Sequence, residues 1–255
     1  MTTAAAPPGG IGALLDEELA LRVAPDEVET LLDYAEAREA GLVAAREGRI
    51  ADTRPALRSA RALARSPLLS EGTTMLATAL LEPVEAYVEY RCGRYGRARA
   101  LLLHASSLDG ILARDHGYTF TSAHRLQIAH NLVRLESRTG DVVRAVELAA
   151  ALLDYIELRV ERVPEAVVSP REDLDAVPVE LLEFYFEEIA AEVADLLADR
   201  LDAAAAALFE PLRVHVGGSG CGDRGFATAA HEWLTQKSLA FDGEAVCAET
   251  LRPRR

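Results

Sequence analysis

Three stretches of the chain share one pattern, and this repetition constrains the fold more than any other feature. The stretches are REGRIADTRPAL from Arg46, RCGRYGRARALL from Arg91 and RTGDVVRAVELA from Arg138. Each reads Arg-x-Gly, then one or two turn residues, then apolar residues at three- and four-residue spacing. That spacing indicates an amphipathic helix, and a glycine lets the preceding helix end in a left-handed turn. The sequence therefore predicts one helical hairpin that recurs three times.

The spacing and the residues that follow the turns support this repeat. Gly48, Gly93 and Gly140 are 45 and 47 residues apart. Five residues after each glycine the chain has a small side chain, followed four residues later by an apolar one: Thr53 and Leu57, Ala98 and Leu102, Ala145 and Ala149. A small residue early in a helix allows a neighbouring helix to approach closely. We therefore expect the second helix of each hairpin to pack through this position.

Helical periodicity covers most of the chain, whereas the alternation typical of strands is almost absent. The expected fold class is all-α: stacked antiparallel helical hairpins followed by a C-terminal capping helix. The expected helices span 11–23, 26–47, 54–65, 74–91 with a break at Pro83, 95–114, 121–139, 142–162, 178–200, 202–212 and 226–239.

One aperiodic stretch divides this helical pattern. Residues 162–178 contain three prolines and several acidic residues, which is typical of a surface loop. The predicted organisation is a disordered N-terminus (1–10), a hairpin block (11–163), a loop (164–177), a hairpin with the capping helix (178–240) and a flexible tail (241–255). We expect these parts to form one compact domain.

The hairpins resemble the tetratricopeptide repeat, best seen in LQIAHNLVRLESRTGDVVRAVELAAALL from Leu126 to Leu153. The resemblance covers about Asp33 to Leu158. The family unit is about 34 residues long, so the spacing here is larger, and the family's aromatic residue early in the first helix is missing. The resemblance implies a right-handed superhelix of stacked hairpins, with a related α-bundle as the alternative.

The resemblance also implies a concave face that is lined by the first helix of each hairpin and binds peptides. On that face it places basic, aromatic and polar residues: Arg38, Arg46, Tyr87, Tyr90, Arg91, Gln127, His130, Arg134 and Arg138. Guanidinium groups pair carboxylates bidentately, so the expected partner is a protein or an acidic peptide segment. Alternatively, these arginines only complement the dipoles at helix C-termini. The predicted function is a non-enzymatic scaffold, adaptor or peptide sensor.

Charge and composition limit the classes of partner that the protein can bind and the cellular compartment in which we expect it. The 255 residues include 27 basic and 41 acidic side chains, a net charge of −14 that disfavours nucleic acids and anionic membranes. No apolar run is long enough to span a bilayer. Three scattered cysteines and an N-terminus without a secretory signal favour the cytoplasm. The sequence leaves the oligomeric state open, a homodimer included.

Catalysis is the alternative to a binding role. Asp115, His116, Tyr118 and His124 gather titratable groups in a loop between hairpins, where they could perform acid–base chemistry if they closed onto a pocket. The alternative function is therefore a small helical enzyme or an accessory protein of a bacterial biosynthetic pathway, with a pocket between the hairpins and the C-terminal block. We expect no cofactor.

Three further patterns resemble metal or nucleotide sites, but each is better explained as part of the structure. His215, Cys221, His231 and Cys247 lack the spacing of a zinc knuckle, so we expect no metal. Gly220-x-Gly222-x-x-Gly225 matches a dinucleotide loop, but the chain has no βαβ unit to hold it, which favours a flexible connector. The run Glu183, Glu187, Glu188 and Glu192 lacks the Glu-x-x-His of di-iron bundles and indicates a solvated helix face.

Overall fold

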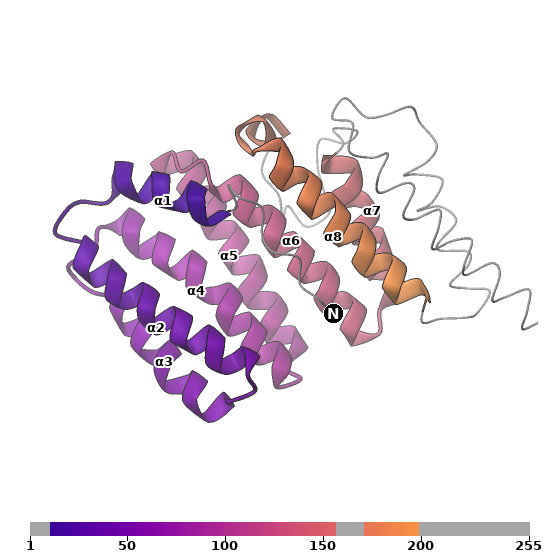
Figure 1. Cartoon of the computed structure of the whole chain (residues 1–255), viewed down its shortest axis with the longest axis horizontal. Helices are drawn as coiled ribbons and strands as arrows, with labels where there is room; N and C mark the ends of the chain where they lie inside the picture. Colours follow the sequence, from indigo (N-terminus) through magenta and orange to yellow (C-terminus); the bar gives the residue numbers. More distant parts are fainter. Residues whose placement is uncertain (1–10, 157–170, 199–255) are drawn as a thin grey trace, which may run out of the picture. The chain divides into compact units, whose positions relative to one another are not determined.

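The computed structural model of the chain describes residues 11–156 and 171–198, and no strand occurs in these two ranges (Figure 1). The fold class is therefore all-α, as predicted. The elements in chain order are α1 (Ile11–Arg22), α2 (Val28–Arg46), α3 (Ile50–Leu63), α4 (Glu71–Arg91), α5 (Tyr95–His116), α6 (Thr121–Thr139), α7 (Val142–Ile156), the 3-10 helix η2 (Arg171–Ala176) and α8 (Val179–Ala198).

The three predicted glycine turns share one backbone geometry. Gly48, Gly93 and Gly140 have φ angles of 76°, 73° and 89°, a left-handed conformation that glycine adopts without steric cost. In each case the next helix begins two residues later. After Gly48 and Gly93 the amide of the following residue donates back to a carbonyl of the last helical turn, namely Arg49 to Ala44 and Arg94 to Glu89. These are Schellman caps, and they confirm the predicted turns.

The predicted small residues lie at the contacts between helices. Thr53, Ala98 and Ala145 are all at most 1% exposed. Leu57, Leu102 and Ala149, which follow one helical turn later, are buried as well. The sequence repeat is therefore a packing repeat: each second helix enters the core through the same two positions.

Close approach is tightest within the first hairpin, where α2 packs against α3. A methyl group added at Gly41 would overlap Leu57 Cδ2 of α3. The core around this contact includes Tyr34, Ala45, Ala60, Leu81 and Val84, so α4 packs onto the same cluster. The Tyr34 hydroxyl donates to the Ala77 carbonyl at 2.6 Å, which ties α2 to α4.

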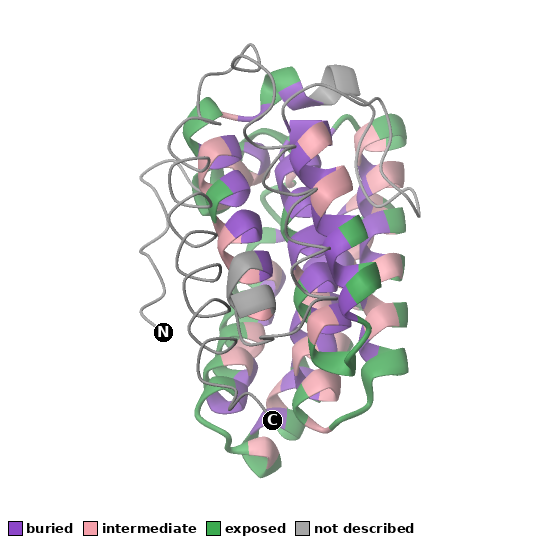
Figure 2. Ribbon diagram, turned by 90° about the vertical axis from the view of Figure 1, so that its right-hand side faces the viewer, coloured by how far each residue is buried: buried purple, intermediate pink, exposed green. Residues whose placement is uncertain are grey.

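The chain divides into two compact units. Unit 1 contains α1–α5, α6 as far as Leu135, and η2; unit 2 contains the end of α6 from Glu136, α7 and α8. Inside unit 2, α7 and α8 bury large apolar side chains, among them Leu152, Leu153, Leu182, Phe186 and Ile189. Figure 2 shows the buried residues on the inward faces of the helices.

One local expectation was wrong. The predicted break at Pro83 does not occur, because α4 runs unbroken from Glu71 to Arg91. Proline removes one backbone hydrogen bond, but Leu80, Leu81 and Val84 around it are buried, and this packing maintains the helix. Of the predicted loop 164–177, the structure describes only 171–177; this part contains η2, and its residues Leu174 and Val177 are at most 5% exposed.

The expected N-terminal disorder, the helices over 202–212 and 226–239, and the C-terminal tail lie outside the described residues. Among the helices that are described, none has the length and apolar character needed to cross a membrane.

Candidate functional site

One face of α4 carries both a structural contact and the central residues of the predicted binding face. Leu76, Leu80, Tyr87 and Arg91 are separated by four, seven and four residues, so they project along one side of the helix. The first half of this stripe belongs to an apolar cluster with Leu112 and others, against which α1 packs through Ile11, Leu14, Leu15 and Leu19. The second half of the stripe consists of Tyr87 and Arg91.

Polar contacts fasten α1 to the turn that joins α5 to α6. The Glu18 carboxylate accepts hydrogen bonds from the Thr119 amide at 2.7 Å and from its hydroxyl at 2.5 Å. Arg22 donates to the carbonyls of His116 at 3.0 Å and Gly117 at 2.5 Å, and it also pairs with Glu18. Burial alone would raise the pKa of Glu18, but hydrogen bonds from Thr119 and Arg22 together lower it below its ordinary value.

Beyond α1, the stripe on α4 ends in a row of tyrosines. The ring centroids of Tyr87 and Tyr90 are 6.3 Å apart, and those of Tyr90 and Tyr95 are 5.9 Å apart. The Arg91 guanidinium lies 5.7 Å from the centre of the Tyr87 ring and donates to its hydroxyl at 2.9 Å. We call Tyr87, Tyr90, Arg91 and Tyr95 the tyrosine platform. None of the four is fully buried, so the platform offers aromatic surface and a cation to a partner.

The remaining residues of the predicted face lie in different surroundings. Arg38 is half-buried and donates to the Leu80 carbonyl at 3.0 Å, so it joins α2 to α4. Arg46, Gln127, Arg134 and Arg138 are exposed. His130 is only 4% exposed and therefore belongs to the core rather than to a contact surface. The structure thus brings together Tyr87, Tyr90 and Arg91 and adds Tyr95, which the sequence analysis did not select.

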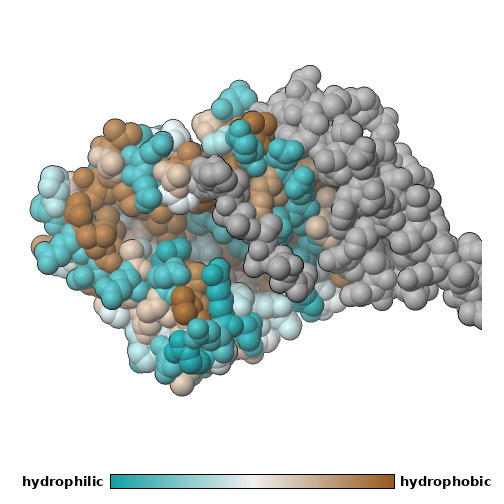
Figure 3. Space-filling model, in the orientation of Figure 1, coloured by the Kyte–Doolittle hydropathy of each residue, from teal (hydrophilic) through white to brown (hydrophobic). Residues whose placement is uncertain are grey.

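The surface that α2 and α4 present in the view of Figure 3 is mixed in polarity. Figure 3 shows hydrophilic and hydrophobic side chains interspersed on this side, with an apolar area where α1 leads into α2. Leu21, Val28 and Leu32, in that region, are 81%, 43% and 65% exposed. The platform is therefore distinguished by its residue types and not by a broad apolar area.

A second candidate site lies on another side of α4. It is a groove of about 470 Å³ lined by α3, α4 and the start of α5. Its lining has an excess of positive charge, with five arginines (Arg54, Arg58, Arg61, Arg94 and Arg97) against three glutamates (Glu82, Glu85 and Glu89). Leu57, Val88 and Leu101 complete the lining. We call it the arginine groove.

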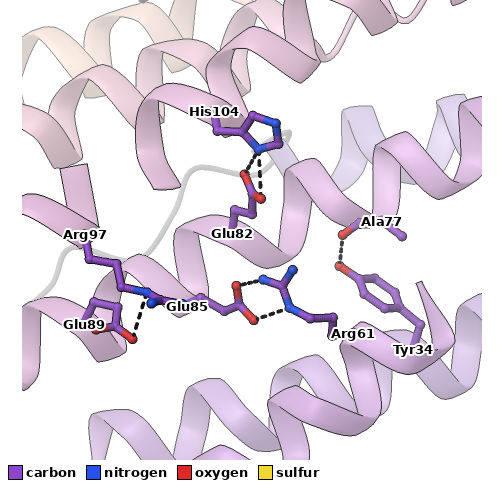
Figure 4. Close-up of polar contacts among 8 residues, drawn as sticks. All are labelled: Tyr34, Arg61, Ala77, Glu82, Glu85, Glu89, Arg97 and His104. Atoms are coloured by element: carbon purple, nitrogen blue, oxygen red, sulfur yellow. Dashed lines mark hydrogen bonds and ion pairs between the residues drawn. The ribbon is translucent and has the colours of Figure 1, made fainter. Parts of the chain in front are cut away.

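Ion pairs fix three of these arginines. Figure 4 shows Arg61 of α3 forming two hydrogen bonds with the carboxylate of Glu85 on α4, one of them 2.9 Å long. Glu89 pairs with Arg94 and lies 3.6 Å from Arg97. The hydrogen bond from Arg94 holds the pKa of Glu89 below its ordinary value. These pairs hold guanidinium groups in place along both walls of the groove.

At the inner part of the groove, Glu82 meets a histidine from α5. The His104 Nδ1 atom lies 2.9 and 2.7 Å from the two Glu82 carboxylate oxygens (Figure 4). Burial raises the pKa of Glu82 above its ordinary value, although the hydrogen bond with His104 acts in the opposite direction. The sequence analysis selected neither residue, because the contact joins positions 22 apart on two different helices.

The residues considered for acid–base chemistry do not converge on a pocket. Asp115 is exposed and pairs with Arg114, whereas Tyr118 is 4% exposed and lies under the Arg22 guanidinium. His124 is also buried, and its Nδ1 atom lies 2.8 Å from Asp109 Oδ2. Asp109 is fully buried, so this pair has no access to a substrate and acts as an internal hydrogen bond between α5 and α6.

The described residues hold no arrangement typical of a metal site. Within 11–156 and 171–198, no group of three or more histidine, cysteine or acidic side chains is arranged to hold a metal ion. His215, Cys221, His231, Cys247 and the glycine motif at 220–225 lie outside the described residues. Glu187 is exposed, and Glu183, Glu188 and Glu192 are partly exposed, as expected for an acidic helix face.

Comparisons with protein families, with curated proteins and with solved structures found no match to this chain.

Proposed function

We propose that the chain is a non-enzymatic helical module that binds a segment of a partner protein through the tyrosine platform. The single observation that carries this proposal is the row of Tyr87, Tyr90 and Tyr95 with the Arg91 guanidinium placed over its first ring. Tyrosine and arginine are the residues that most often dominate protein contacts, since they combine a large apolar area with directed polar groups. The resemblance to tetratricopeptide repeats is consistent with this role and stays a prediction.

The position of α1 supports the proposal further. This helix packs on the first half of the same stripe of α4, so the stripe accommodates a helical segment. A partner segment that continued along the stripe would reach the tyrosine platform. There, a carboxylate on the segment could pair with Arg91, and an apolar side chain could cover Tyr90.

Peptide selection tests this proposal even while the partner is unidentified. We expect the immobilised protein to enrich carboxylate-bearing peptides from a displayed random library. In fluorescence anisotropy, the variant Tyr90→Ser/Arg91→Gln should bind the enriched peptides at least about tenfold more weakly, since two platform contacts are lost.

Matched variants give the test its specificity. Arg114→Gln changes an exposed arginine at the far end of α5 and should bind as the wild type does. Arg54→Gln/Arg58→Gln, in the arginine groove, should likewise have no effect. Failure to enrich any peptide, or equal binding by the platform variant, would overturn the proposal.

The sequence also suggested a small enzyme as the alternative. That alternative requires a pocket onto which titratable residues such as His116 and His124 close. The groove described above is lined by arginine, glutamate, leucine and valine, and none of these histidines is part of it. No observation in the described residues favours the enzymatic alternative.

A further inference from the structure

The arginine groove contains two guanidinium groups, those of Arg54 and Arg58, that are not held by an ion pair among the described residues. Arg54 and Arg58 lie four residues apart on one face of α3, and both are exposed. Neither forms a hydrogen bond or an ion pair within the part of the chain that the structure describes. The other three arginines of the groove, Arg61, Arg94 and Arg97, form ion pairs with Glu85 and Glu89. In a chain of net charge −14, this groove is a local site for negative charge.

An acidic helix face of matching length exists elsewhere in the same chain. Glu180, Glu183 and Glu187 of α8 are separated by three and four residues, so they lie on one side of the helix. The opposite side, with Leu182, Phe186 and Ile189, is buried. We call Glu180, Glu183, Phe184 and Glu187 the acidic stripe; Phe184 is only partly buried within it.

Nothing within α8 offsets the charge of the acidic stripe. The helix contains no lysine or arginine. Burial raises the pKa of Glu187, and the neighbouring charges of Glu183 and Glu188 raise it further. A cationic surface placed against the stripe would relieve this repulsion.

We infer that the chain self-associates, with the acidic stripe of one copy lying in the arginine groove of a second copy. Glu183 to Glu187 and Arg54 to Arg58 each span four residues, about 6 Å along a helix axis. Two carboxylates on the stripe can therefore pair with Arg54 and Arg58. Leu101 in the groove provides apolar surface for Phe184.

The second copy is the occupant that the observations favour, because the complementary surface is encoded in the chain itself. Groove and stripe are different surfaces, so a single contact of this kind is heterologous. Repetition then gives either a reciprocal dimer, in which each stripe fills the other groove, or a larger ring or chain. This inference does not depend on the tyrosine platform and uses a different side of α4.

Charge reversal in the full-length protein tests the inference. The molar mass is measured by light scattering after size exclusion and by sedimentation, from micromolar to submillimolar concentration. We expect the wild type to associate. The groove variant Arg54→Glu/Arg58→Glu and the stripe variant Glu183→Arg/Glu187→Arg should each be monomeric, because like charges then face each other.

Mixing the two variants makes the test specific to this contact. The stripe of the groove variant still fits the groove of the stripe variant, so an equimolar mixture should form a one-to-one complex. A chain with all four substitutions should associate again, because the charges are complementary once more. The milder Arg54→Gln/Arg58→Gln should weaken association at least tenfold and checks the result if a reversed variant unfolds.

Control variants separate this contact from a general charge effect. Arg65→Glu/Arg114→Glu and Glu36→Arg/Glu39→Arg make the same charge changes at exposed positions outside groove and stripe, and both should associate as the wild type does. A wild type that stays monomeric at every concentration would overturn the inference. Equal loss of association in the controls, or no complex in the mixture, would do the same.

Discussion

At Gly41, a single hydrogen atom in place of a side chain sets the distance between two helices. The nearest groups to an added Cβ are Leu57 Cδ2 and Cγ, with Ala56 Cβ at 3.6 Å. Leu57 is itself held in the core of unit 1, so it cannot swing away freely. The sequence repeat predicted one side of this contact, because Leu57 is the apolar residue at the repeated position after the Gly48 turn.

Gly41→Ala should therefore destabilise the protein, although alanine is the better helix former. We expect the free energy of unfolding to fall by about 1–3 kcal/mol, as in other overpacked cores. Gly96→Ala is the matched control, since it also lies in a helix but has open space around the added methyl group. That control should be neutral or stabilising by up to about 1 kcal/mol. Equal effects in urea denaturation would contradict the packing argument.

His130 gives a pH-dependent prediction at the same scale. Burial, reinforced by the charge of Arg134, lowers its pKa to about 3. In the unfolded chain the ring titrates near 6.5, about the ordinary value. Between these pH values the unfolded chain binds a proton that the folded chain does not, so stability falls as the pH falls, by up to about 1.4 kcal/mol per pH unit.

The variant His130→Gln should remove this contribution. The free energy of unfolding, measured in urea from pH 7 to pH 4, should decline less steeply in the variant than in the wild type. An NMR titration provides an independent check, since the ring protons of His130 should show no titration above about pH 5 while the protein is folded. Parallel stability curves would show that the ring is protonated in the folded state.

Among the helices, α1 illustrates what the sequence could and could not predict. Its periodicity predicted a helix over 11–23, close to the observed Ile11–Arg22. Its docking onto α4 and its polar attachment to Thr119 join residues about 100 positions apart, and no local pattern encodes such a pairing. The same reason explains why the arginine groove was missed: Arg54, Arg58 and Arg61 share a face of α3, but their glutamate neighbours lie on α4.

Glu18→Gln should loosen α1 without unfolding the rest of unit 1. The carboxylate accepts two hydrogen bonds from Thr119 and pairs with Arg22, and an amide cannot replace all of these contacts. We expect faster hydrogen exchange in α1 at pH 7, with little change in α2 and α3. Because the folded pKa of Glu18 is lowered, this contribution is complete above about pH 4.3, the unfolded value, and is lost as the pH falls through the folded value.

The difference between wild type and Glu18→Gln should therefore shrink at acid pH. Hydrogen exchange of α1, compared at pH 7 and near pH 3 after correction for intrinsic rates, measures this directly. If wild type and variant differed in exchange by the same factor at both pH values, the loosening of α1 would result from the altered shape of the side chain and not from the lost charge.

At the scale of the whole molecule, the described chain divides into two compact units. Leu112 is fully buried in unit 1, and Leu153 is fully buried in unit 2. The all-α class followed from helical periodicity and from turn glycines, which are local signals. The sequence indicated a division at the aperiodic stretch 162–178, and one limit between the units lies there, between Val177 and Pro178. The limit within α6, between Leu135 and Glu136, was not predicted, because no change in the sequence pattern accompanies it.

Cavity-forming substitutions should act mainly within one unit. Each of Leu112→Ala and Leu153→Ala should cost about 2–5 kcal/mol, the usual range for buried leucine. Hydrogen exchange should rise in α4 and α5 for the first variant and in α7 and α8 for the second. Equal acceleration in both units by either variant would instead indicate one cooperative core.

The second helices of the first two hairpins begin in the same way but differ in length, and the extra length of α5 makes contact with α1. Both α3 and α5 begin two residues after a glycine turn, but α3 has 14 residues and α5 has 22. The eight additional residues lengthen α5 by about 12 Å, a little more than two helical turns. Its last carbonyl, from His116, and that of Gly117 are the acceptors for Arg22. The length of the second helix thus differs between hairpins. The longer helix, α5, provides the carbonyl groups to which α1 is attached through Arg22.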